Sequence, residues 1–129
     1  MKKRYLCPHC EAVLNPNVKI VLLAKTEDVR GLMLLNAKPG DYGLIFDPEF
    51  SLEEGEMVEF ACPVCGGDLR SAADPHFVEI LLDLGGASYS KVEFSRIYGE
   101  HATFIIDGRQ VEAFGEDAPD FEDINFFGH

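Results

Sequence analysis

Short apolar runs, each bounded by turn-forming residues, recur along the whole chain. Val, Ile, Leu and Phe dominate these runs, and such residues are typical of buried or half-buried β-strands. No segment shows the sustained 3.6-residue period of an amphipathic helix. The pattern therefore predicts a mostly β protein with strands over residues 18–24, 30–36, 42–47, 56–60, 77–83, 91–97, 103–106 and 110–114.

The turns between these runs have their own signatures. Asn15-Pro16-Asn17 precedes the first predicted strand, and Lys38-Pro39-Gly40-Asp41 separates the second from the third. Asp107-Gly108 joins the last two, and an Asp-Gly pair between two apolar runs is the strongest short-range signal for a β-hairpin. We therefore expect an antiparallel β-sheet body.

The two halves of the chain follow a similar order of features. Each half has a Cys-Pro-x-Cys motif, a Leu four residues later, a proline, and then three predicted strands. When the halves are aligned at one fixed spacing, Leu22 lies over Leu81 and Gly40 over Gly99. The hypothesis of two related β halves follows, and it predicts that Leu22 and Leu81 are both buried.

All four cysteines lie in two motifs, Cys7-Pro8-His9-Cys10 and Cys62-Pro63-Val64-Cys65. Two residues between paired cysteines let one tight turn present both sulfurs to one ion, and four thiolates match the tetrahedral shell of a structural Zn²⁺. The 51 residues between the motifs add only about 1 kcal/mol of loop-closure cost over a spacer a third as long. We therefore expect Cys7, Cys10, Cys62 and Cys65 to bind one zinc ion, with no catalytic residues.

The second motif continues as Cys62-Pro63-Val64-Cys65-Gly66-Gly67, which resembles the knuckle shared by zinc ribbons and rubredoxins. In that knuckle, glycine after the second cysteine allows a positive φ. Glu11 takes the corresponding position in the first motif. That likeness covers only the two knuckles, and the rest of the chain resembles small bacterial zinc-ribbon proteins with a β-rich body. The resemblance implies a zinc-ribbon-like pair of knuckles joined to that body, with a rubredoxin-like iron site that carries one electron as the alternative.

The first motif has a second resemblance. Cys7-Pro8-His9-Cys10 is similar to the redox tetrapeptide of thioredoxin-fold disulfide oxidoreductases, whose first cysteine is a low-pKa nucleophile at a helix N-terminus. The turn at Asn15-Pro16-Asn17 leaves no room for such a helix. Thiol-disulfide exchange is therefore the less favoured alternative, and His9 is expected to be a polar knuckle residue.

Composition and charge restrict the classes of molecule that the protein is expected to bind. The chain of 129 residues is 47% apolar, which is typical of one globular domain. Its net charge of −12 argues against nucleic-acid binding, which uses clustered Lys and Arg. No apolar run approaches the roughly 20 residues that span a bilayer, and the basic start shows no secretion signal. We expect a cytoplasmic protein without nucleic-acid or membrane contacts, where reduced thiols favour a metal over disulfides.

We expect residues 1–115 to form a single β-rich zinc-binding domain and residues 116–129 to form an acidic, aromatic tail. The tail interleaves acids with Phe121, Ile124, Phe126 and Phe127. It fits either packing on the protein's own sheet, as a helical turn starting at Asp120, or docking to a partner or a second copy.

Catalytic motifs are missing from the sequence, which has no phosphate-binding loop, no His-Glu-x-x-His and no nucleophile elbow. His76, His101 and His129 are scattered and are expected in turns or on the surface. The expected function is that of a non-enzymatic binding or adaptor protein, which contacts another protein or itself.

Overall fold

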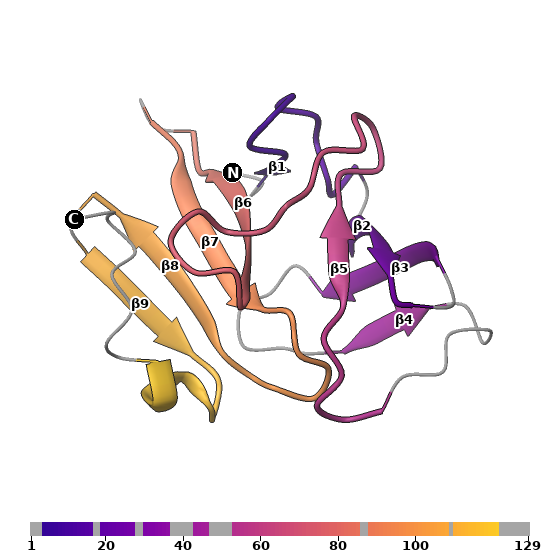
Figure 1. Ribbon diagram of the computed structural model, residues 1–129. Coiled ribbons are helices and arrows are strands. Elements are labelled where there is room, and N and C mark those ends of the chain that lie inside the picture. The colour runs from indigo at the N-terminus through magenta and orange to yellow at the C-terminus, as the bar shows by residue number, and fades with distance from the viewer. Residues whose placement is uncertain are drawn as a thin grey trace.

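Two antiparallel β-sheets form the body of the protein (Figure 1). The computed structural model describes residues 4–16, 19–27, 30–36, 43–46, 53–85, 88–108 and 110–121. Strands make up 51% of the described residues, which include almost no helix, so the prediction of a mostly β fold is confirmed. The described residues include no helix with the length and apolar character that a membrane span needs.

The larger sheet has five strands, in the order β1 (Arg4–Leu6), β6 (Phe77–Asp83), β7 (Ser90–Ser95), β8 (Thr103–Asp107) and β9 (Gln110–Phe114). The smaller sheet has four, in the order β4 (Leu44–Phe46), β3 (Arg30–Asn36), β2 (Lys19–Lys25) and β5 (Glu59–Ala61). One short 3-10 helix, η1 (Ala118–Phe121), follows β9. The predicted bounds of β3, β6 and β9 match these, whereas β1 was not expected. The ends of the predicted strand 42–47 lie outside the described residues.

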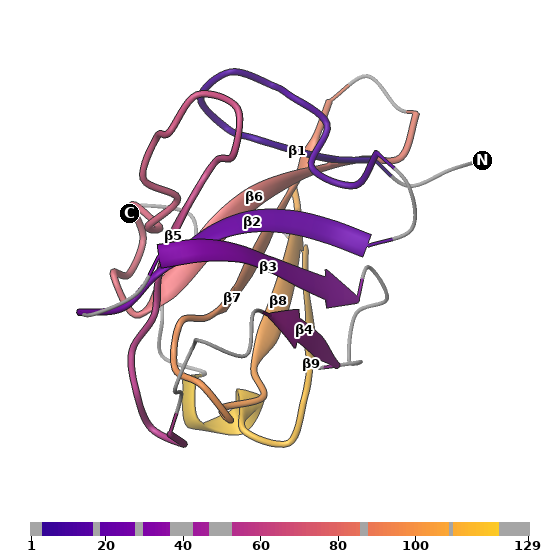
Figure 2. The same ribbon diagram turned by 90° about the vertical axis from the view of Figure 1, so that its right-hand side faces the viewer.

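The two halves of the chain have the same topology. In the first half β2 pairs with β3 and β3 with β4, and in the second half β6 pairs with β7 and β7 with β8. The strand before each knuckle joins the sheet of the other half, because β1 pairs with β6 and β5 with β2. Each half therefore completes its sheet with a strand from the other, which ties the two together near the knuckles (Figure 2).

The pairing register fixes which residues of the two halves correspond. Tyr5 pairs with Leu82, and Phe60, which occupies the same position before the second knuckle, pairs with Ala24. Ala24 therefore corresponds to Leu82, and not to Asp83 as the fixed spacing of the sequence alignment would have it.

The corrected register changes one expectation about the core. Leu22 corresponds to Ile80, and both side chains are fully buried between the sheets. Leu81 is only half-buried, on the opposite face of β6. The prediction that Leu81 shares the core with Leu22 is wrong, because a shift of one residue moves a strand side chain to the other face.

Two hydrophobic clusters hold the described part of the chain together. The larger fills the space between the sheets and draws on both, with Tyr5, Leu14, Ile20, Leu22, Met33, Val58, Phe60, Val78, Ile80, Leu82 and Val92 among its members. The smaller lies on the outer face of the larger sheet, where Phe77, Phe104 and Ile106 pack against Ala118 and Phe121.

The second hydrophobic cluster shows where the first part of the predicted tail packs. Residues up to Phe121 pack on the protein's own sheet, as a 3-10 helix that starts at Ala118 and not as a turn that starts at Asp120. Ile124, Phe126 and Phe127 lie outside the described residues.

Core substitutions test the corrected register. We expect Leu22→Ala and Ile80→Ala each to lower the free energy of unfolding by about 2–5 kcal/mol, because both side chains are fully buried. Leu81→Ala is the matched control and should cost about 1 kcal/mol. Denaturant titration measures all three values. Equal losses at Ile80 and Leu81 would contradict the register.

Candidate metal centre

The two knuckles lie side by side at one end of the sandwich, directly after β1 and β5 (Figures 1 and 2). Their four Sγ atoms all lie within 4.8 Å of one another. The sulfurs of Cys7 and Cys65 are 3.8 Å apart, and so are those of Cys10 and Cys62. Both distances join one knuckle to the other. The fold therefore brings the four predicted ligands into one cluster that could hold a metal ion.

Both knuckles have the same backbone conformation. The N–H of Glu11 donates to the carbonyl of Cys7, and the N–H of Gly66 donates to that of Cys62, each at 2.9 Å. Glu11 has a φ of 60° and Gly66 a φ of 74°. The left-handed conformation costs a residue with a Cβ about 1–2 kcal/mol, which glycine avoids. The first knuckle thus keeps the same turn without the glycine.

Backbone N–H groups point at the buried sulfurs. The N–H of His9 lies 3.3 Å from Sγ of Cys7, and the N–H of Val64 lies 3.3 Å from Sγ of Cys62. Burial acts to raise the pKa of Cys62, but the N–H groups of Cys65 and Val64, together with the contacts that its sulfur makes with Cys7 and Cys10, lower that pKa overall. For Cys7 burial dominates and raises the pKa. Such N–H donors stabilise thiolates, the form that binds a metal.

The geometry of the cluster fits a tetrahedral metal. With metal–sulfur bonds of about 2.3 Å, the sulfurs of a regular tetrahedron lie about 3.8 Å apart. Two of the observed distances have this value, and the remaining ones need only small side-chain adjustments. Four thiolates fill a tetrahedral shell, which leaves no position for water or substrate on the ion.

His9 links the first knuckle to the loop after the second. Its Nε2 lies 2.7 Å from the carbonyl oxygen of Asp68. Its ring covers Gly67, where an added Cβ would lie 2.8 Å from Cδ2 of His9. A residue with a side chain would displace the histidine, so glycine is needed at position 67 for this close approach. His9 therefore has a contact that its place in the motif did not suggest.

The cluster has a buried and an exposed side. Cys7 and Cys62 are buried in the core, whereas Cys10 and Cys65 are exposed. Val64, at the tip of the second knuckle, is 70% exposed. Solvent and chelators therefore reach a bound ion through the outer pair of sulfurs.

The histidines outside the knuckles do not join the cluster. His76 and His101 are half-buried, and each faces a carboxylate, Glu100 at 2.6 Å and Glu116 at 3.1 Å. His129 lies outside the described residues. Two features gave no signal in the sequence: a buried carboxyl group on β7, and an aromatic cavity at the far end of the sandwich.

No protein-family model matches the chain, and no curated protein or solved structure matches it. The interpretation of the site therefore depends on its own geometry.

Proposed function

We propose that the protein is a non-enzymatic, cytoplasmic binding module that is held together by one structural zinc ion and associates with a second copy of itself. The observation behind the zinc is the closed cluster of four sulfurs at the junction of the two halves. A complete thiolate shell stabilises a fold but offers no open coordination position, so it supports a structural role over catalysis.

A rubredoxin-like iron site that carries one electron is the second candidate. Iron also takes four cysteine thiolates, and N–H groups directed at the sulfurs tune such sites. The exposed Cys10 and Cys65 would give an electron a short path to the surface. Thiol-disulfide exchange is less well supported. After Cys10 the chain turns back so that Val13 forms a β-bridge with Leu6, and residues 11–16 contain no helix that would lower the pKa of Cys7.

The outer face of the smaller sheet is the proposed contact surface, and we call it the apolar face. The pairing register places Val21, Leu23, Leu32, Leu34 and Ile45 on it. Leu32 and Ile45 are each 53% exposed. Neither hydrophobic cluster of the described residues includes these side chains, whereas η1 covers the corresponding face of the larger sheet. Exposed apolar patches of this kind mark interaction sites.

Charge and chain length favour residues 122–129 of a second copy as the occupant of the apolar face. Lys19, Lys25 and Arg30 lie at the ends of β2 and β3, around the apolar residues. The segment combines acids that suit these three cations with apolar side chains that suit the patch: Glu122, Asp123, Ile124, Phe126 and Phe127.

The route to this face favours a second copy over the same chain. The segment follows Phe121, which packs on the outer face of the larger sheet. Eight residues reach at most about 28 Å, and within one chain they would have to pass around the edge of the sandwich. Exchange between two copies avoids that path.

Substitutions on the apolar face test the proposal. We expect the metal-loaded wild type to be a dimer in light scattering at about 100 μM, a concentration that detects even weak self-association. The double variant Leu32→Asp with Ile45→Asp should be a monomer, because the charges cannot be buried without partners. Deletion of residues 122–129 should give the same result.

Val111→Asp is the matched control, since Val111 is 42% exposed on β9, in the larger sheet. That variant should remain a dimer. A monomeric wild type would show that self-association is wrong. A dimer that survives the deletion but not the double variant would show that the occupant is not the segment 122–129.

A further inference from the structure

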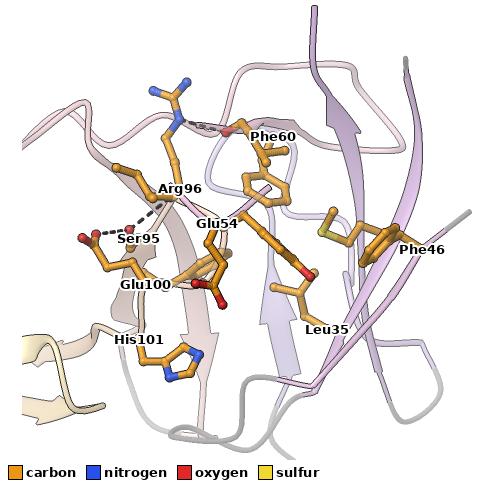
Figure 3. A pocket seen from close by; sticks show the side chains of 14 residues that line it. Leu35, Phe46, Glu54, Phe60, Ser95, Arg96, Glu100 and His101 are labelled. Atoms are coloured by element: carbon orange, nitrogen blue, oxygen red, sulfur yellow. Dashed lines mark hydrogen bonds between the residues drawn. The ribbon is translucent and has the colours of Figure 1, made fainter. Parts of the chain in front are cut away.

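A cavity lies between the two sheets, lined by residues of both, at the end of the sandwich away from the knuckles (Figure 3). Its volume is about 310 Å³, at the small end of the range for ligand sites. It lies between the chain before β5 and the connection from β7 to β8. The described residues around it include Leu35, Phe46, Glu54, Phe60, Phe94 and Tyr98.

Four aromatic rings from different parts of the chain surround this space. The rings of Phe60 and Phe94 are 5.9 Å apart between centroids, at an interplanar angle of 68°. Those of Phe46 and Tyr98 are 6.2 Å apart, at 89°. The four aromatic side chains therefore give this space an apolar, π-rich lining, and a cation within about 6 Å of a ring centroid is attracted by the negative face of that ring.

An exposed carboxylate, that of Glu54, lies beside the rings. In Figure 3, Glu54 has Phe46 and Phe60 on one side of it and Glu100 and His101 on the other. Glu54 is exposed, and its stem packs on Gly99, where an added Cβ would lie 3.1 Å from Cγ of Glu54. The net charge of −12 adds a long-range attraction for positive ligands.

Other charged groups around the cavity have partners within the protein. The Nε of Arg96 donates to the carbonyl of Val58 at 3.1 Å, and a terminal nitrogen donates to that of Pro75 at 2.5 Å. In Figure 3 the guanidinium points away from the rings. Glu100 is held by His76, at 2.6 Å from Nε2. Among the described lining residues, Glu54 is thus the charged group best placed to meet a ligand.

We propose that this cavity binds a small organic cation of the quaternary ammonium or methylated amine class. The cationic head lies among the rings of Phe46, Phe60, Phe94 and Tyr98, and Glu54 faces it from the mouth. This site is separate from the knuckles and from the apolar face, so its ligand contacts neither the metal cluster nor the proposed dimer surface.

A pair of isosteric probes tests the proposal. Choline and 3,3-dimethylbutan-1-ol have the same shape, but only choline carries a charge. In NMR titrations of the metal-loaded protein, we expect choline to shift the signals of the cavity residues saturably. The neutral alcohol should bind at least about tenfold more weakly, because it lacks the attraction between cation and ring.

Two variants locate the site. Glu54→Gln should weaken choline binding about three- to tenfold without loss of stability, since Glu54 is exposed. Glu112→Gln, at an exposed position on β9, is the matched charge control and should bind as the wild type does. Phe46→Leu should abolish saturable binding in a protein that still folds.

Three outcomes would overturn the proposal. The first is equal affinity for choline and the alcohol, which would indicate a merely apolar cavity. The second is no saturable shift with choline or tetramethylammonium at about 50 mM, a concentration that would nearly saturate a site with a dissociation constant of about 1 mM. The third is unchanged binding in both Glu54→Gln and a folded Phe46→Leu variant.

Discussion

Cys62→Ser is expected to leave the protein largely unfolded, with far less than one bound metal ion per chain. Cys62 is fully buried, and its sulfur lies 3.8 Å from that of Cys10. Apparent binding free energies of structural zinc are about 10–16 kcal/mol, as large as the whole stability of a typical domain. Because β1 and β5 each join the sheet of the other half, loss of the ion also loosens the junction between the halves.

Metal analysis and thermal unfolding monitored by circular dichroism measure this effect. His9→Ala is the matched control, because His9 lies within the first knuckle and contacts Asp68 without belonging to the sulfur cluster. That variant should keep its metal and lose only a few degrees of melting temperature. Full metal content and an unchanged melting curve in Cys62→Ser would rule out the four-cysteine site.

The same samples identify the metal. Untreated wild-type protein should be colourless and contain one zinc per chain, since zinc has no partly filled d shell. A red protein with one iron per chain would support the electron-carrier candidate in place of the zinc proposal.

The sequence predicted the elements whose signals are local. β3, β6 and β9 are apolar or alternating runs between turn residues, and the structure places them at the predicted bounds. β1 is much shorter, and it is a strand because it pairs with β6, which belongs to the other half of the chain. A contact over that distance leaves no pattern in so short a segment, so this strand could not be predicted.

The same distinction separates the two candidate sites. The cluster of four cysteines could be predicted because the spacing within each Cys-Pro-x-Cys motif is itself the signal for a metal-binding turn. The cavity is different, since its rings come from strands and loops far apart in the sequence and each looks like an ordinary core residue. Phe46 and Phe94 lie together only because both sheets contribute to one core.

Identical residues in the two halves were also not enough to determine which strand residues correspond to each other. The number of residues between corresponding positions of the two halves increases along the chain. Three pairs show this increase: Cys7 and Cys62 in the knuckles, Leu22 and Ile80 in β2 and β6, and Leu34 and Glu93 in β3 and β7. A single fixed spacing therefore aligns Leu22 with Leu81, which faces the wrong way. Hydrogen-bond pairing, and not residue identity, determines the face of a strand residue.

Glu93 is the other residue whose surroundings the sequence did not reveal. In the run Lys91-Val92-Glu93-Phe94 it occupies a polar position of an alternating strand, which usually faces solvent. The structure buries it completely, on the outer face of the larger sheet, opposite Glu79 on β6. Neither carboxylate oxygen has a hydrogen-bond partner of good geometry among the described residues. The corresponding residue of the first half is Leu34.

This environment makes the charged form of Glu93 unfavourable. Burial raises the pKa of Glu93 to about 7, from an ordinary value of 4.5. The Ser71 hydroxyl and Lys91 lower it, whereas Glu79 and Asp74 raise it. Between pH 4.5 and about 7 the folded protein therefore holds a proton that the unfolded chain has already released. The contribution of Glu93 to stability is then lost as the pH rises through this window, by about 3 kcal/mol in total.

Glu93→Gln is accordingly expected to remove this loss of stability. Glu93→Leu introduces the residue found at the corresponding position of the first half, and its free energy of unfolding at pH 8 should exceed that of the wild type by about 2–3 kcal/mol. Urea unfolding of the metal-loaded proteins at pH 5, 6, 7 and 8 measures the effect. The comparison is the difference between wild type and variant at each pH, because acid weakens metal binding equally in both. Glu112→Gln, at an exposed position on β9, is the control and should follow the wild type throughout. A difference between wild type and Glu93→Gln that stays constant from pH 5 to 8 would show that Glu93 does not ionise in this range.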